Sequence, residues 1–307
     1  MGLSTFDAFK HVHDNADCVQ ISEHQLKDLQ RVLVLMLRDV KAACEDASVP
    51  FFLGGGSCLG AVRHQGFIPW DDDLDLNMSH NDFNAFKESL NRLFPNKYWV
   101  HEPEITPGYT LAFPRIRLKG TVLRNRDDSP SSSEVGVYLD IFFIENLPDN
   151  IILRTLHGLG SLSIGFLYSC RRALDNDMQN RNLFGRRSEV YKTLKFKSNI
   201  GRMLAILSTE HWTTIWNKWN SIGKNGQSKY ISIPSGRRHY FGELHERASF
   251  YPQKFVSFDG IEAPIPNKYD EYLSALYGDD YMVPPSEAQR ETHVVYEFDL
   301  GEYSDKR

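Results

Sequence analysis

The chain has 307 residues, of which 41% are hydrophobic and 24% are charged, a balance typical of a globular protein with a sizeable buried core. Its 35 Lys and Arg residues against 40 Asp and Glu residues give a formal net charge of −5, which excludes a general basic surface for nucleic acid. The four cysteines form no C-x-x-C pair and lie near no His cluster, so the sequence predicts neither a zinc site nor a disulfide framework. A reducing compartment, the cytoplasm, is the expected location.

Helices and short strands alternate in the first part of the chain. Apolar residues recur at steps of three and four over residues 23–46, which predicts a helix with one buried face. The elements predicted next are, in chain order, a strand at 51–53, a glycine turn at 54–57, a short helix at 59–64, a half-buried strand at 73–78, and a helix to about residue 93 whose start, Ser79 with Asp82, resembles a capping box.

Strands dominate the next stretch. They are expected at 99–101, 111–118, 122–124 and 135–144, with a turn at Lys119 and Gly120 between the second and third. Near the C-terminus, residues 269–277 predict a last helix that ends at Gly278.

The middle of the chain differs in composition from the rest. Residues 151–221 have a helical pattern, and between Arg171 and Arg202 there are nine Lys or Arg residues but only three acids. This basic region predicts either a solvated helical face or contact with an anionic lipid headgroup or a lipid-linked diphosphate.

The most apolar stretch is 151–170, but Arg154 and His157 interrupt it, so it predicts a buried or interfacial helix and not a membrane span. We therefore expect peripheral contact with the inner face of a membrane through residues 151–222. Three parts are expected: a catalytic core at 1–150, a basic helical insert at 151–228, and a C-terminal segment at 229–307 that packs back on the core.

An acidic cluster stands out against the small net charge. Asp71, Asp72 and Asp73 are consecutive, and Asp75 follows one step later. Residues two apart on a strand project to the same face, so Asp73 and Asp75 should point together. Paired carboxylates repel unless a cation lies between them, and all-oxygen ligands favour Mg²⁺ or Mn²⁺, which also bind substrate phosphates. A metal site and a phosphate-bearing substrate are predicted.

The glycine turn lies just upstream of this cluster. Gly55, Gly56 and Ser57 fall between a strand and a helix, where backbone N–H groups can face an anion. Such a turn alone is a weak signal, but its pairing with the D-x-D strand predicts a phosphate cradle. Arg63 and His64, on the short helix, are either donor contacts or packing and capping groups.

A third carboxylate, Asp140, lies in the apolar strand at 135–144, where an unpartnered charge would be costly. It is expected to complete the metal site, to act as general base, or to form a salt bridge at a strand edge. Arg115 and Arg117 share one strand face and either hold phosphate oxygens or face solvent.

The C-terminal segment is rich in Pro. We expect it either to fold back over a site or to close the sheet. Its candidate substrate contacts are Tyr277, Tyr281, Arg290 and His293, and Trp70, beside the acidic cluster, is another.

Residues 53–78 read LGGGSCLGAVRHQGFIPWDDDLDLNM and resemble the signature of the LicD family of phosphotransferases, which is related to the fukutin-type ribitol-phosphate transferases. The resemblance continues in FPRIR (113–117), YLDIF (138–142), FDG (258–260), PIP (264–266), YGDDYM (277–282), Pro284, Pro285 and His293.

This resemblance implies a nucleotidyltransferase fold: an α+β protein with a mixed sheet flanked by helices and a mainly helical insert. It implies transfer of a phospho-alcohol, typically phosphocholine from CDP-choline, to a hydroxyl of a cell-surface glycan, such as teichoic acid or lipopolysaccharide, or its lipid-linked precursor. Asp73 and Asp75 match the family's metal-binding pair, Asp71 a third acidic position, and Asp140 the later strand carboxylate. A metal-dependent Asp-x-Asp glycosyltransferase and an inactive scaffold are the alternatives.

Overall fold

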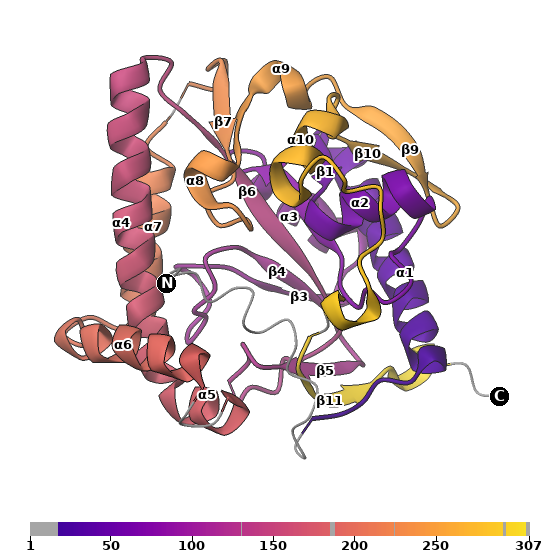
Figure 1. Cartoon of the computed structure of the whole chain (residues 1–307). Helices are drawn as coiled ribbons and strands as arrows, with labels where there is room; N and C mark the ends of the chain where they lie inside the picture. The colour runs from indigo at the N-terminus through magenta and orange to yellow at the C-terminus, as the bar shows by residue number, and fades with distance from the viewer. Residues whose placement is uncertain (1–17, 130, 185–187, 224, 291–292, 305–307) are drawn as a thin grey trace.

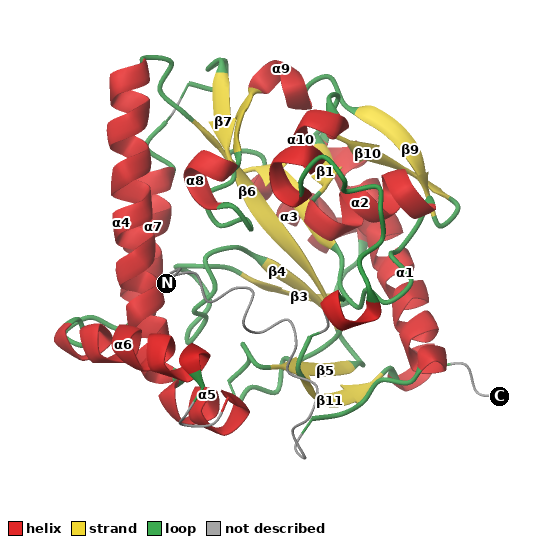
Figure 2. Ribbon diagram, viewed as in Figure 1, coloured by secondary structure: helices red, strands yellow, loops and turns green. Residues whose placement is uncertain are grey.

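The computed structural model describes residues 18–129, 131–184, 188–223, 225–290 and 293–304 (Figure 1). A seven-stranded mixed sheet runs through this part of the chain, and helices flank it (Figure 2). The predicted fold class is confirmed. Five strands follow one another across the sheet in the order β1 (Phe51–Leu53), β2 (Asp75–Ser79), β6 (Tyr138–Asn146), β4 (Arg115–Leu118) and β3 (Tyr98–His101).

The register of the central strands determines which side chains meet. β2 and β6 are parallel, with Asp75 opposite Asp140. β4 is antiparallel to β6, with Arg115 opposite the same Asp140. Residues paired across neighbouring strands project to one face, so these three side chains share a face of the sheet. Two further strands, β7 (Tyr230–Ser232) and β8 (Leu244–Glu246), extend the sheet from the end of β6.

The predicted first helix is confirmed as α1 (Glu23–Ala47). Ser22 and Gln25 form a capping box at its start, in which the Ser22 N–H donates to Gln25 Oε1 at 2.9 Å. Its apolar stripe is fully buried at Leu29 and Met36. The helix packs against α3 (Phe83–Leu93), so these two helices bury one side of the main core.

Four helices are inserted between β6 and β7: α4 (Ile151–Asp175), α5 (Asp177–Phe184), α6 (Glu189–Met203) and α7 (Thr209–Asn220). α4 and α7 lie side by side at one edge of the molecule (Figure 1). Tyr168 and Trp216 stack on each other in a small core separate from the main one. The Tyr168 hydroxyl donates to Thr110 O at 2.7 Å, which ties the insert to the core.

The C-terminal part returns to the core through short elements: α8 (His239–Gly242), α9 (Arg247–Phe250), β9 (Lys254–Phe258), β10 (Ile261–Ile265), α10 (Tyr269–Tyr277), η2 (Glu287–Gln289), β11 (Val295–Asp299) and η3 (Gly301–Tyr303). Phe250, Phe258 and Leu273 are fully buried in the main core. The predicted helix at 269–277 is confirmed, and α10 packs against α2 (Gly55–His64).

Several predicted boundaries are wrong. α2 begins at Gly55, inside the expected glycine turn, because the carbonyl of its N-cap, Gly54, already accepts the Cys58 N–H at 2.9 Å. β2 begins at Asp75, so Asp73 precedes the strand. Ser79 is the last residue of β2 and pairs with Ile144, so the expected capping box is replaced by an N-cap at Asp82.

One strand is shorter than predicted. β4 begins at Arg115 and not at residue 111, because Pro114 has no N–H to give to a ladder. The predicted turn at Gly120 (φ 81°) and the strand after it, β5 (Val122–Asn125), are confirmed. β5 pairs with β11, so a strand from the far end of the chain completes a separate two-stranded sheet here.

Candidate active site

The acidic cluster gathers at the start of β2, where β2 lies against β6. Asp75 and Asp140 are opposite each other on the two parallel strands. Burial and the nearby carboxylates of Asp73 and Asp140 raise the pKa of Asp75 well above its ordinary value. Burial likewise raises the pKa of Asp73 to about 6, with Asp72 and Asp140 adding to the effect and His293 opposing it. Like charges held this close favour a bound cation.

His293 is the cationic partner of this cluster. Its Nδ1 lies 2.6 Å from Asp72 Oδ1 and its Nε2 lies 3.6 Å from Asp73 Oδ2. The Asp72 carboxylate, against the opposing effect of burial, raises the pKa of His293 well above its ordinary value. These contacts favour the protonated imidazole, whose positive charge offsets that of the Asp72 carboxylate, 221 residues earlier in the chain.

Asp72 is a site residue that the sequence reasoning missed. Ligand atoms of Asp72, Asp73 and His293 lie within 4.8 Å of one another, close enough to surround an ion if the imidazole is neutral. Of the three consecutive acids, Asp72 is the one that the sequence did not assign to the metal site. The signal was present in the run of three acids, but nothing local indicates which of them a distant histidine contacts.

The glycine-rich start of α2 lies directly against the carboxylates. A Cβ at Gly55 would lie 3.3 Å from Asp75 Oδ2, and one at Gly56 would lie 3.0 Å from Asp71 Oδ2. The Ser57 hydroxyl accepts a hydrogen bond from Asp75 N at 2.9 Å. The helix N-terminus and the acids therefore meet as predicted, and Ser57 holds the start of β2 in place.

Tyr272, from α10, is a second residue that sequence reasoning missed. Its hydroxyl accepts the Gly55 N–H at 2.9 Å and the Asn77 side-chain amide at 3.1 Å. Tyr272 is 2% exposed. One backbone donor of the predicted phosphate cradle is thus occupied by the protein, and the same contact fixes α2 relative to β2.

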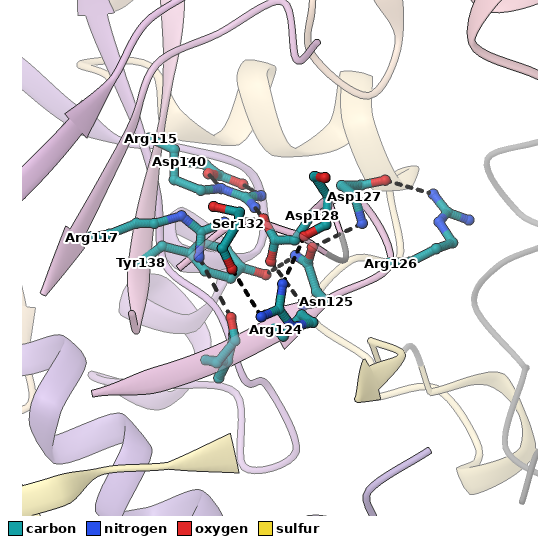
Figure 3. Close-up of polar contacts among 12 residues, drawn as sticks. Arg115, Arg117, Arg124, Asn125, Arg126, Asp127, Asp128, Ser132, Tyr138 and Asp140 are labelled. Atoms are coloured by element: carbon teal, nitrogen blue, oxygen red, sulfur yellow. Dashed lines mark hydrogen bonds and ion pairs between the residues drawn. The ribbon is translucent and has the colours of Figure 1, made fainter. Parts of the chain in front are cut away.

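Arg115 is buried and paired with Asp140. Its Nε donates to Asp140 Oδ1 at 2.6 Å and its Nη2 donates to Asp140 Oδ2 at 2.8 Å, while its guanidinium lies 3.7 Å above the Tyr138 ring (Figure 3). A salt bridge was one of the three roles that the sequence allowed for Asp140. The alternative of a solvent-facing Arg115 is wrong, because only 2% of the residue is exposed.

Arg117 is buried as well, so a solvent-facing role is wrong for it too. Its Nη1 donates to Gly136 O at 3.0 Å and its Nη2 pairs with Asp128 (Figure 3). These contacts hold the loop between β5 and β6. The predicted role of both arginines in binding the donor stays a prediction. Arg115 Nη1 and Arg117 Nε are buried without a hydrogen-bond partner among the described residues, while the other guanidinium nitrogens of both residues bond to protein groups.

Three further arginines surround the cluster, each beside an aromatic residue. Arg63 donates to the Tyr281 carbonyl at 2.8 Å and also contacts His64 Nε2 at 2.9 Å. The Arg290 guanidinium lies 4.2 Å above the Trp70 ring. The sequence reasoning had named all five residues, and the structure places them in two contacting groups.

Arg237 is the third arginine, and the sequence reasoning missed it. Its guanidinium lies 4.9 Å above the ring of Tyr277. The Tyr277 hydroxyl in turn lies 3.6 Å from where a Cβ of Gly55 would be. Tyr281 is different: its own hydroxyl pairs with Asp270 on α10, which gives it a structural role in closing this segment.

Comparison with known proteins agrees with this geometry. The sequence profile described as "LicD/FKTN/FKRP, nucleotidyltransferase domain" matches residues 48–148, the stretch that contains the α2 N-terminus, β2 and β6. The chain is 24% identical over 283 residues to the lipopolysaccharide cholinephosphotransferase LicD of Haemophilus influenzae, a match that covers 88% of this chain and 96% of that protein.

Two other relatives match over short stretches. The human ribitol 5-phosphate transferase FKRP is 46% identical over 52 residues, 17% of this chain and 10% of that protein. The mouse ribitol-5-phosphate transferase FKTN is 29% identical over 85 residues, 26% of this chain and 17% of that protein. Residues 48–148 are therefore a nucleotidyltransferase domain of the LicD/FKTN/FKRP kind, and the chain is a distant homologue of the LicD cholinephosphotransferase and of the FKRP and FKTN ribitol-phosphate transferases.

Proposed function

We propose that this protein transfers a phospho-alcohol, phosphocholine from CDP-choline in the first instance, to a hydroxyl group of a cell-surface glycan or its lipid-linked precursor, with release of CMP. The observation that carries the proposal is the placement of Asp75 beside Asp140 on parallel strands, directly against the N-terminus of α2. A relative that aligns over most of both chains is a cholinephosphotransferase, which supports the choice of headgroup.

The acids fit a divalent cation. The donor set at the start of β2 is carboxylate oxygen, and burial raises the pKa of Asp73 to about 6, so ionising the cluster without a cation is costly. Hard oxygen donors of this kind suit Mg²⁺ or Mn²⁺. Asp73 and Asp75 would hold the ion, with Asp71 and Asp140 adjacent. When bound, such an ion neutralises the charge of a diphosphate.

The protein groups around the acids supply the rest of the reaction. Gly55 and Gly56 let the start of α2 lie close against the Asp75 and Asp71 carboxylates, so a diphosphate held by the ion would lie near this helix N-terminus. Arg63 adds positive charge beside Asp71. Arg115 holds both oxygens of Asp140 from the neighbouring strand β4, so it fixes that carboxylate and offsets its charge next to the acids of β2. The acceptor hydroxyl would then attack the distal phosphorus of the CDP-linked donor in line with the bond to CMP, and CMP would leave.

We propose that the reaction takes place in the cytoplasm, at the inner face of the membrane. Cys44, Cys58 and Cys170 are buried free thiols, as expected in a reducing compartment. We also propose that residues 1–150, 151–228 and 229–307 act as catalytic core, acceptor-side insert and closing segment. The small core around Tyr168 and Trp216 of the insert, which also includes Ala112, is separate from the main hydrophobic core and supports that division.

The test is turnover of the full chain against a panel of CDP-linked alcohols, CDP-choline, CDP-ribitol and CDP-glycerol, with Mg²⁺ present and with EDTA. We expect Mg²⁺-dependent CMP release, fastest with CDP-choline. Faster release from another CDP-alcohol would change the headgroup and leave the reaction type in place. If the protein instead releases a nucleoside diphosphate from a nucleotide sugar and releases no CMP, the proposal is wrong and the protein is a glycosyltransferase.

A further inference from the structure

One face of α4 is exposed and apolar over its first half. Large side chains repeat there at helical spacing with high exposure: Ile152 67%, Leu156 58%, Leu159 52% and Leu162 39%. Of the described helices, α4 is the one long and apolar enough to cross a membrane. It lies at the edge of the molecule, away from the sheet (Figure 1). A contiguous apolar surface of this kind indicates an interaction site.

The two residues that interrupt the apolar stretch in the sequence turn inward. Arg154 is 7% exposed, donates to the carbonyls of Pro148 and Asp149 at 3.0 and 2.9 Å, and lies 3.7 Å from the Tyr230 ring centre. His157, also 7% exposed, lies 2.7 Å from Trp219 O. Both polar groups are satisfied inside the protein, so the outer face of α4 carries no charge from residue 151 to 170.

The hydroxyl groups on the outer face are also satisfied within the helix. Thr155 Oγ1 donates to Ile151 O at 2.8 Å, and Ser163 Oγ donates to Leu159 O at 2.8 Å. In lipid every polar hydrogen must find an acceptor in the protein, and these two hydroxyls meet that requirement. The outer face of α4 can therefore lie against hydrocarbon without leaving these hydroxyls unsatisfied.

A cavity of about 450 Å³ opens beside the same face, between α4 and α7. Its walls are mostly apolar and include Leu147, Pro148, Leu153, Leu156, Trp219 and Ile222. Leu156 belongs to both the exposed face and the cavity wall, so the two are continuous. A cavity of this size and composition fits a hydrocarbon chain.

Charge complements an anionic lipid surface. Residues 151–223 contain eleven Lys and Arg against four Asp and Glu, a net +7 in a chain whose total is −5. Lys192 and Arg202 on α6 are exposed, although Lys192 pairs with Glu189 and part of the surplus is neutralised in the same way. Two copies docked through this face would bring two positive inserts together, so a second copy fits it less well than anionic lipid does.

We infer that the outer face of α4 is a bilayer-docking surface, and that the cavity beside it takes one hydrocarbon chain from an anionic membrane. α4 packs along its length on α6 and α7, so it lies in the interface plane and does not span. The inference deepens the proposed function by placing the enzyme at a lipid-borne acceptor. It narrows the sequence-based expectation of peripheral contact through residues 151–222, because it assigns the contact to apolar residues of α4, with the basic residues assisting.

The experiment is flotation of the full chain with vesicles of phosphatidylcholine, with and without phosphatidylglycerol. We expect binding that is stronger with the anionic lipid and that falls about tenfold in Leu156→Gln/Leu159→Gln, because two large apolar contacts are lost. Leu93→Gln/Phe255→Gln is the matched control, since these residues are 39% and 49% exposed on the core. It should bind as the parent does. Equal loss in both variants, or no binding by the parent, overturns the inference.

Two more measurements separate the remaining explanations. Vesicles with brominated acyl chains should quench Trp fluorescence in the parent and in Trp99→Phe, but less in Trp219→Phe, because Trp219 lines the cavity. Equal quenching in all three overturns the cavity assignment.

A dimer in solution that Leu156→Gln/Leu159→Gln dissociates would assign the face to a second copy instead. CMP release from soluble CDP-choline should be unchanged in the vesicle-binding variants, so loss of that activity reports on the proposed function and not on docking.

Discussion

Arg115 donates two hydrogen bonds to Asp140, from Nε at 2.6 Å and from Nη2 at 2.8 Å. The residues are opposite each other on β4 and β6 and are 2% and 7% exposed. Asp140 is also opposite Asp75 on β2, so one strand position links the buried salt bridge to the acidic cluster.

Removing Arg115 should destabilise the protein strongly. Arg115→Met leaves Asp140 as an unpaired buried charge, and we expect the free energy of unfolding to fall by about 3–5 kcal/mol. Urea denaturation measures this change. Arg115→Met/Asp140→Asn should recover part of the loss, because the remaining buried group is neutral. Lys192→Met is the control, since that exposed pair with Glu189 should contribute less than about 1 kcal/mol. Similar losses in the two single variants would contradict the account.

Asp75→Asn should separate metal binding from folding. The variant removes one of several repelling carboxylates, so we expect its melting temperature in EDTA to equal or exceed that of the parent. The rise in melting temperature that Mg²⁺ produces in the parent should disappear, and CMP release should fall by about 10²–10³. Glu45→Gln, whose side chain is 65% exposed, should keep both properties. A Mg²⁺ response that persists in Asp75→Asn would place the ion elsewhere.

Gly55→Ala should disturb the site through backbone and space together. Gly55 has φ +40°, and a Cβ there would lie 3.3 Å from Asp75 Oδ2. We expect a loss of about 1–2 kcal/mol in the free energy of unfolding together with weaker Mg²⁺ binding. Gly108→Ala has the same kind of backbone strain, φ +77°, with nothing within 4 Å, so it should lose stability without affecting Mg²⁺ binding. Calorimetric titration of both variants is the measurement, and equal Mg²⁺ affinities would be the contrary result.

Arg237→Gln should weaken binding of the donor. The Arg237 guanidinium lies above Tyr277 beside the start of α2, where a diphosphate would meet it. We expect KM for the CDP-linked donor to rise about tenfold with a smaller change in kcat, because a charge-assisted contact is lost. Arg238→Gln is the neighbouring control, since Arg238 Nε donates to Leu276 O on α10. A change confined to kcat would assign Arg237 to the chemical step instead.

Glu243 should make stability fall as pH rises. Burial raises the pKa of Glu243 to about 8, although Arg238 N donates to its Oε1 at 3.0 Å. At pH values between the ordinary carboxyl pKa and about 8, Glu243 keeps a proton in the folded state that it releases in the unfolded state. The free energy of unfolding therefore falls as the pH rises through this range, by an amount on the order of 4 kcal/mol.

Glu243→Gln removes this dependence, because the amide stays neutral at every pH. Its free energy of unfolding relative to the parent should therefore be higher at pH 8 than at pH 5. Glu246→Gln, at a surface pair with Lys229, should show no such difference. Parallel slopes of stability against pH for the parent and Glu243→Gln would refute the assignment.

Local pattern was sufficient for much of the fold. The three- and four-residue apolar steps of α1 and the end of α10 at Gly278 depend on residues near one another in the chain, and the structure has them as predicted. The D-x-D segment and the glycine run are likewise adjacent in sequence, so their meeting at the start of β2 follows from one short strand–helix–strand unit.

Only the tertiary structure decided what lies opposite those residues. His293 contacts Asp72, which is 221 positions away in the chain, and the Tyr272 hydroxyl accepts the Gly55 N–H. Arg115 pairs with Asp140 because β4 and β6 are neighbours in the sheet. The same holds for α4, where Arg154 and His157 turn inward to partners on other elements and leave an apolar outer face. The physical reason is that local periodicity specifies which face of an element is apolar, whereas the partner of a buried charge depends on which distant element packs against it.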